Sequence, residues 1–279
     1  MSLYIIIPII ILVVLVIAFL VWQLKDIVTT KYVFKNGNLS NALDGFNILH
    51  ISDLHNNNCQ KRLVSIIENQ SPDIIVVSGD LIDSDKTNVG TALKLISRII
   101  TIAPIYYVQG NHEARLKTYI QFAASLRKSG VNVLDNTSAT FCYKNTIINL
   151  VGIISPIYKS DFSSKLEKSE FNCIKTIINS NVKKGVLNIL LAHNPEQLAL
   201  YSQCNVDLVF SGHAHGGMIR LPFIGGIIAP NQGLFPKYTS GIHKANGTSM
   251  VISRGVGNHF PIFRIFNRPE VVVVTLKSK

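Results

Sequence analysis

The feature that most constrains the fold of this chain is a series of short apolar runs that each end in small and polar residues. Three of them come early, at residues 46–52 (FNILHIS), 73–79 (DIIVVSG) and 104–110 (PIYYVQG). Runs of this length bounded by turn residues indicate buried strands. Between them, residues 61–69 and 89–102 carry apolar residues at three- and four-residue spacing, which predicts helices. The alternation predicts a largely parallel sheet with right-handed connections.

The second half of the chain is mixed, because its last apolar runs lack helices between them. Strands are predicted at 146–153, 186–193, 206–213, 248–255 and 270–276, and a helix at 161–179. We therefore expect a second sheet packed on the first, giving an α/β fold that is a four-layer α/β/β/α sandwich of two mixed sheets. Segment 222–247 is rich in Gly and Pro and predicts a long loop, which is either functional or a tolerated surface insertion.

An uncharged segment from Leu3 to Trp22 precedes the predicted strands and is long enough to cross a bilayer as a helix. A secretory signal would show a basic start and a small-residue cleavage site, and a buried helix of this length would usually have a polar face. We therefore predict one transmembrane helix. The expected division is an anchor at 1–24, a juxtamembrane linker at 25–44 and a folded domain at 45–279.

Charge and cysteine content narrow the partners that the protein can have. The 279 residues carry a formal net charge of +11, but the basic residues are scattered, so no nucleic-acid partner is expected. Attraction to anionic membrane lipid or to a phosphorylated substrate is the expected use of this charge. Lys25, Lys31 and Lys35 follow the apolar segment, which favours a single-pass protein of the cell membrane with a cytoplasmic domain; an outward-facing domain is the alternative.

The four cysteines show no CxxC spacing, and each is expected to be buried.

Polar residues of the types that bind metals end five of the predicted strands. They lie in the sequences DLH, GDLID, GNHE, AHNP and GHAH, which contain Asp53, His55, Asp80, Asp83, Asn111, His112, Glu113, His193, His213 and His215. The C-terminal ends of strands in α/β sheets line the ligand crevice, so these side chains can converge. Carboxylate, imidazole and amide ligands together favour Mn, Fe or Zn over Mg or Ca.

Each of these short sequences taken alone has an ordinary structural explanation. A second GNH, ending at His259, lies outside the ordered series. Asp53 and His55 are two residues apart, which in extended chain places both side chains on one face, and His213 and His215 repeat this spacing. The combination of five such motifs, each ending a predicted strand, is what favours a metal site.

The ordered series DxH, GDxxD, GNH(E/D), H and GHxH resembles the calcineurin-like metallophosphoesterase superfamily, from residue 46 to about residue 276. The sequences GHAHGGMIRLP and SRGVGNHFPIFRIFNRPE are similar to its membrane-associated bacterial subgroup that includes YaeI and YkuE. That subgroup usually has Gln in place of Met218, and Asp is common in place of Glu113. The resemblance implies a catalytic domain with two divalent ions, the first held by Asp53, His55 and His215, the second by Asn111, His193 and His213, with Asp80 bridging them.

The resemblance also implies roles for the remaining candidates. His112 is expected to be the catalytic histidine, either stabilising charge on the phosphoryl group or protonating the leaving oxygen, and Glu113 to orient it. Asp83 is expected to hold metal ligands by hydrogen bonds. The implied activity is hydrolysis of a phosphoester or pyrophosphate by metal-activated hydroxide. The alternatives are a UDP-2,3-diacylglucosamine-type pyrophosphatase, whose substrate is lipid-linked and contains a nucleotide, and a phosphoprotein phosphatase; no substrate-binding residue is predicted.

Overall fold

The computed structural model describes residues 3–37, 39–156, 166–258 and 264–278. The first sheet has the order β1-β16-β2-β3-β4-β5. Strands β2 to β5 run parallel to one another, β16 runs antiparallel to β2, and β1 runs parallel to β16 at the edge. The strands are β1 (Val28–Lys35), β2 (Asn47–Ile51), β3 (Ile74–Val77), β4 (Ile105–Tyr107), β5 (Asn132–Val133) and β16 (Glu270–Lys277).

The second sheet has the order β14-β15-β9-β8-β7-β6 and is also mixed. Its four central strands are parallel, and the edge strands β14 and β6 run antiparallel to their neighbours. The strands are β6 (Ser138–Tyr143), β7 (Thr146–Ile153), β8 (Leu187–Ala192), β9 (Leu208–Ser211), β14 (Gly241–Ala245) and β15 (Thr248–Ile252).

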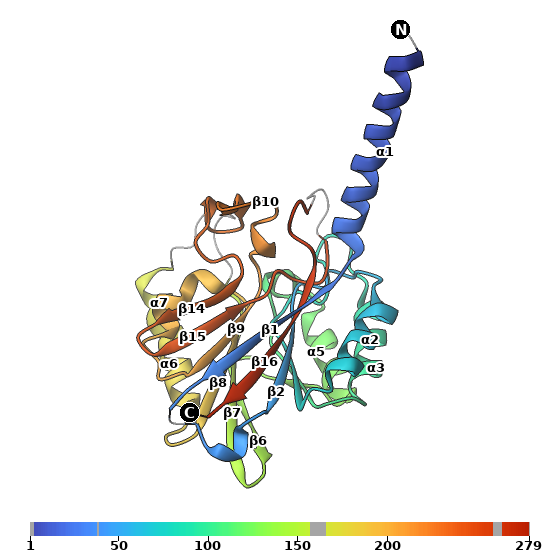
Figure 1. Ribbon diagram of the computed structural model, residues 1–279. Helices are drawn as coiled ribbons and strands as arrows, with labels where there is room; N and C mark the ends of the chain where they lie inside the picture. The colour runs from blue at the N-terminus through green and yellow to red at the C-terminus, as the bar shows by residue number, and fades with distance from the viewer. Residues whose placement is uncertain (1–2, 38, 157–165, 259–263, 279) are drawn as a thin grey trace.

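Helices cover the outer face of each sheet, which gives the predicted four layers (Figure 1). The first sheet is covered by α2 (Gln60–Gln70), α3 (Val89–Ile99) and α5 (Tyr119–Lys128), and the second by α6 (Lys168–Asn181) and α7 (Leu198–Tyr201). A third apolar core fills the space between the sheets, with Phe46 and Val76 from the first and Ile189 and Phe210 from the second. The prediction of an α/β/β/α sandwich is confirmed.

The strands predicted from apolar runs are all present, with ends that differ by a few residues. They were visible in the sequence because each central strand is buried on both faces and is therefore apolar throughout, as in the IIVV of β3. The helix predicted at 161–179 is observed as α6, whereas residues 157–165 lie outside the described part of the chain.

Two segments that were expected to lack regular structure contribute strands. Residues 28–35, within the predicted linker 25–44, form β1 of the first sheet, and residues 241–245, within the predicted loop 222–247, form β14 of the second. Both are edge strands with partly exposed residues along their length, so neither leaves a strong apolar run in the sequence. Residues 28–35 of the predicted linker therefore belong to the first sheet.

The rest of the predicted loop folds into two small hairpins. They are β10 (Arg220–Leu221) with β11 (Gly225–Gly226), and β12 (Ile228–Ala229) with β13 (Gly233–Leu234).

The prediction that all four cysteines are buried is wrong, because Cys142 and Cys173 are exposed on the edge strand β6 and on α6. Both β6 and α6 have one face toward solvent.

Helix α1 (Leu3–Lys25) projects from one end of the domain (Figure 1). It is long and apolar enough to cross a membrane, and its apolar part is not buried within the protein. Two residues, Asp26 and Ile27, separate it from β1.

Candidate metal centre

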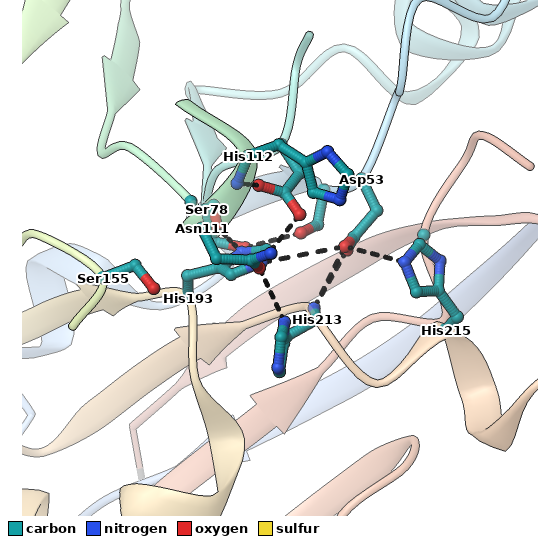
Figure 2. Close-up of polar contacts among 12 residues, drawn as sticks. Asp53, Ser78, Asn111, His112, Ser155, His193, His213 and His215 are labelled. Atoms are coloured by element: carbon teal, nitrogen blue, oxygen red, sulfur yellow. Dashed lines mark hydrogen bonds and ion pairs between the residues drawn. The ribbon is translucent and has the colours of Figure 1, made fainter. Parts of the chain in front are cut away.

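The candidate residues gather at the C-terminal ends of strands from both sheets (Figure 2). The first sheet contributes the turns after β2 and β3 and the short helix α4 (Asn111–Ala114) after β4; the second contributes the residues after β8 and the turn after β9, which includes the 3-10 helix η3 (His215–Gly217). Asn111 and Asp83 are half-buried, and the others are buried, namely Asp53, His55, Asp80, His112, Glu113, His193, His213 and His215.

The backbone at these strand ends forms tight turns rather than extended chain. Five of the candidates have φ angles between 45° and 66°, in the left-handed region: Asp53, His55, Asp80, His213 and His215. The prediction that Asp53 and His55, and likewise His213 and His215, share one face of extended chain is therefore wrong. Both pairs nevertheless reach the same cluster. A non-glycine residue held in this region costs about 1–3 kcal/mol, so the surrounding contacts must stabilise these turns.

Glycines let the turns of the two sheets approach each other closely. A Cβ at Gly212 would overlap Ser52 and Asp53 of the first sheet. Gly217 has φ 77°, and a Cβ there would overlap the backbone of Gly226 in the β10–β11 hairpin. The absence of a side chain at Gly212 and Gly217 therefore permits close backbone approach beside the cluster.

The first ligand group is Asp53, His55 and His215, whose ligand atoms lie within 4.8 Å of one another. The Nε2 atoms of His55 and His215 are 3.9 Å and 3.6 Å from Asp53 Oδ1. Two atoms that bind one ion at about 2.1 Å each can be at most about 4.2 Å apart. The spacing in this group therefore fits a single ion.

The second ligand group is Asp80, His193 and His213, again within 4.8 Å of one another. Asn111 completes it, because its Oδ1 is 3.0 Å from His193 Nε2 and 2.8 Å from His213 Nδ1. The Oδ2 atom of Asp80 is 3.1 Å from His193 Nε2 and also 3.8 Å from His55 Nε2 in the first group. Asp80 therefore lies between the two groups.

Asp83 and His112 lie at one side of the first group. Asp83 is 3.7 Å from His55 Nδ1 and 3.8 Å from His112 Nδ1, distances of ion pairs rather than of hydrogen bonds. The backbone N–H of Ser84 donates to His112 Nδ1 over 3.1 Å. Because Nδ1 accepts this bond, the proton of the neutral His112 ring is on Nε2.

Glu113 makes different contacts from those expected. Its carboxylate accepts hydrogen bonds from the backbone N–H groups of Asp80, Ile82 and Gly110, at 2.8, 3.1 and 2.9 Å. Glu113 therefore joins the turn after β3 to the turn before α4. From the sequence it was expected to orient the His112 ring instead. Burial and then the charge of Asp80 raise the pKa of Glu113 to about 8.

The electrostatics of the cluster suit cations. Burial alone would disfavour a charge on Asp80, but the imidazoles, above all His193, hold the pKa of Asp80 well below its usual value. Burial would lower the pKa of His193, yet the carboxylates of Asp80 and Asp53 raise it to about 10. Burial raises the pKa of Asp53 to about 6. Buried carboxylates so close together require compensating positive charge, which divalent ions at the two ligand groups would provide.

Sequence reasoning missed residues that hold the ligands in place. Asn231 Nδ2 lies 2.8 Å from His213 Nε2 and donates to Glu196 over 3.2 Å. Asn267 Nδ2 donates to the carbonyls of His215 and Met218, at 2.7 and 2.8 Å. The only sequence signal for Asn231 was its place in the loop 222–247, and Asn267 gave none, because single asparagines are common.

Gly257 and Asn258 of the second GNH motif have a structural role. The N–H of Gly257 donates to the carbonyl of Asp53 over 2.7 Å, and Asn258 Nδ2 donates to the carbonyl of Leu24 over 3.0 Å. His259 lies outside the described residues.

Comparison with known proteins gives consistent family matches. Residues 46–217 match the calcineurin-like phosphoesterase family. The chain is 28% identical over 261 residues to the uncharacterized metallophosphoesterase YkuE of Bacillus subtilis, covering 90% of this chain and 85% of that protein. It is 27% identical over 243 residues to phosphodiesterase YaeI of Escherichia coli, covering 83% and 82%.

Two further similar proteins are longer than this chain. A transmembrane protein with a metallophosphoesterase domain from Danio rerio is 25% identical over 254 residues, which are 86% of this chain and 55% of that protein. Among solved structures, the NAD nucleotidase of Haemophilus influenzae is similar in fold, with a TM-score of 0.51, 17% identity, and coverage of 75% of this chain and 45% of that one.

Proposed function

The chain belongs to the calcineurin-like phosphoesterase family of metal-dependent phosphoester hydrolases, and we propose that it acts as a membrane-anchored enzyme with two divalent metal ions. In this proposal residues 3–25 form the anchor and the catalytic domain begins at Asp26, since β1 already belongs to the first sheet. The single-pass helix α1, which is exposed and apolar, supports the anchoring.

Asp80 is the observation that carries the two-metal proposal. Asp53, His55 and His215 would hold one ion, Asn111, His193 and His213 the other, and Asp80 lies within 3.8 Å of a histidine from each set. Ions of Mn, Fe or Zn fit this mixture of oxygen and nitrogen ligands. When bound, such a pair would supply a Lewis acid for the phosphoryl oxygens and lower the pKa of the attacking water.

His112 is proposed to donate a hydrogen bond to the reacting phosphoryl group or leaving oxygen. Its Nδ1 atom accepts from the Ser84 N–H, so the neutral ring presents an Nε2–H. The ring centroid is 4.6 Å from that of His55, which places it beside the first ligand group. An imidazolium would carry a second proton on Nδ1, which would point at the Ser84 N–H. Stabilisation of charge by a neutral His112 ring is therefore favoured over proton transfer from a charged one.

The substrate is proposed to be a phosphodiester or a lipid-linked pyrophosphate. The diester is suggested by the printed name of the Escherichia coli relative, phosphodiesterase YaeI. A lipid-linked substrate is suggested by α1, which would hold the catalytic domain at a bilayer. A phosphoprotein substrate would use the same ligand groups, and the monoester in the substrate panel stands for it.

Metal analysis of the full chain in detergent, combined with a substrate panel, tests the proposal. We expect two Mn, Fe or Zn ions per chain and cleavage of an aryl phosphodiester, a monoester or a pyrophosphate. Chelation should abolish cleavage and readdition of the metal should restore it. The absence of bound metal after loading, together with no cleavage of any substrate, would refute the proposal.

A further inference from the structure

Large apolar side chains are exposed on the hairpins that follow η3 and on the segment before β16. We call this set the apolar rim; its members are Leu221, Phe223, Ile224, Leu234, Phe235 and Phe266. Phe223, between β10 and β11, is fully exposed, and Leu234 and Phe235 are 68% and 67% exposed. Exposed apolar side chains gathered in this way mark a surface that contacts a partner.

The apolar rim is continuous with helix α1. The rings of Phe19 in α1 and Phe266 in the rim are 5.6 Å apart. The segment of Phe266 also joins the first hairpin, because Ile219 pairs with Ile265 and the Arg220 N–H donates to the Ile265 carbonyl over 3.0 Å. Figure 1 shows the β10 hairpin and α1 at the same end of the domain.

The end of α1 is also fixed to the domain, so the rim keeps its place relative to the helix. The buried Gln23 accepts a hydrogen bond from the Asn267 N–H over 3.2 Å. Asp26, directly after the helix, forms ion pairs with Arg62 and Arg268. A bilayer crossed by α1 would therefore lie against the apolar rim.

We propose that the apolar rim is a second membrane contact, which inserts into the bilayer that α1 crosses and opens the metal centre onto the headgroup layer. The exposed Lys25 ends α1 and the exposed Lys237 follows Phe235 by two residues, and both suit anionic headgroups. The rim also adjoins the cluster, because the Ile227 N–H donates to the Gly217 carbonyl over 3.2 Å. The inference rests on the proposed anchored phosphoesterase and narrows its substrates to phosphate esters of an amphiphile lying in the headgroup layer.

Depth-dependent fluorescence quenching tests the contact without using activity. Trp22 is the sole tryptophan, so Trp22→Phe provides a silent background for Phe223→Trp, with Ile120→Trp as the control, because Ile120 is 78% exposed on α5. The full chain is reconstituted in phosphatidylcholine and phosphatidylglycerol vesicles, with or without bromine on the acyl chains. We expect brominated lipid to remove most of the Phe223→Trp emission and to leave the Ile120→Trp emission unchanged. Equal emission of Phe223→Trp in both vesicles overturns the inference.

Hydrolysis of two substrates then tests the consequence for function. A double variant, Phe223→Asp with Phe235→Asp, is called the rim variant, and Ile120→Asp is its control. For each, the rates of hydrolysis of a lipid-borne phosphate ester and of a soluble aryl ester are measured. The ratio of lipid-borne to soluble hydrolysis should fall about tenfold or more in the rim variant, since one phenylalanine gains at least that factor on leaving water, and should stay constant in the control. An unchanged ratio in the rim variant contradicts the substrate class. If neither ester is cleaved by the unaltered chain, the proposed function fails, whereas the quenching result still decides the membrane contact.

Discussion

The two sheets supply different chemistry to the metal centre. Among the candidate ligands, the first sheet brings the carboxylates Asp53 and Asp80, the amide of Asn111 and the imidazole of His55. The candidates from the second sheet are all imidazoles, those of His193, His213 and His215. The candidate carboxylates therefore all come from one half of the domain, and the other half contributes imidazole nitrogens.

The two halves also differ in what supports them. On the first side, Glu113 ties the turns of Asp80 and Gly110 together through backbone N–H groups, so the support is local to neighbouring strands. On the second side, Asn231 and Asn267 reach the histidine turn from other parts of the chain. The turn of Asp80 is therefore supported within the first sheet, whereas the histidine turn depends on the segments that carry the apolar rim.

The largest expected effect is that of Asp80→Asn, which removes the bridging charge of the first side. We expect loss of bound metal and a fall in turnover of more than about 10⁴-fold, because such metal stabilisation is worth several kcal/mol at about 1.4 kcal/mol per tenfold. Metal analysis and kcat measure this, with the exposed Asp44→Asn as control. Full metal content in Asp80→Asn would remove the distinction between the two sides.

His112→Gln separates chemistry from metal binding on the same side. We expect both ions to be retained and kcat to fall by about 10²–10⁴-fold, the usual contribution of a positioned acid, base or donor. The control is His243→Gln, since His243 lies on the edge strand β14. Loss of metal in His112→Gln would instead make it a ligand, as its proximity to His55 and Asp83 allows.

Asn231→Leu tests the support of the second side. Removing the contact with His213 Nε2 should weaken metal affinity by about 10–100-fold, as is typical for groups that orient metal-binding histidines. Metal titration followed by calorimetry measures it, and Asn132→Ala, which loses one hydrogen bond to the Ile105 carbonyl on the first sheet, is the control. Equal affinity in the two variants would show that the second side needs no support from the loop.

Glu113→Gln is expected to have the smallest effect on turnover and to act on stability. A glutamine amide cannot accept at its NH₂ group, so at least one of the three backbone N–H groups would lose its partner, at about 1–3 kcal/mol. Denaturant unfolding of the metal-free protein measures this cost. A fall in kcat as large as that of His112→Gln, at unchanged stability, would restore the orienting role expected from the sequence.

The sequence predicted the identity of the candidate ligands better than their geometry. Metal binding restricts the residue types, so the five motifs at strand ends pointed to residues that the structure brings together. The left-handed turns at Asp53 and His213 could not be predicted, because contacts with the other sheet hold them and no local pattern encodes those contacts.

The same reasoning explains what was missed in the fold. Central strands such as β3 are buried on both faces and read as continuous apolar runs, whereas the edge strands β1 and β14 do not. Asn231 and Ser84 act through hydrogen bonds to residues far away in the chain, which leave no periodic signal. Tertiary contacts of this kind are visible only once the chain is folded.

The place of β16 has a consequence for the order in which the protein can form. β16 lies between β1 and β2, although about 240 residues separate it from β1, its parallel neighbour, along the chain. During synthesis β1 leaves the ribosome long before β16, its partner in the first sheet. That sheet can close only when residues 270–277 emerge, so β1 stays unpaired in it until nearly all of the domain has been made.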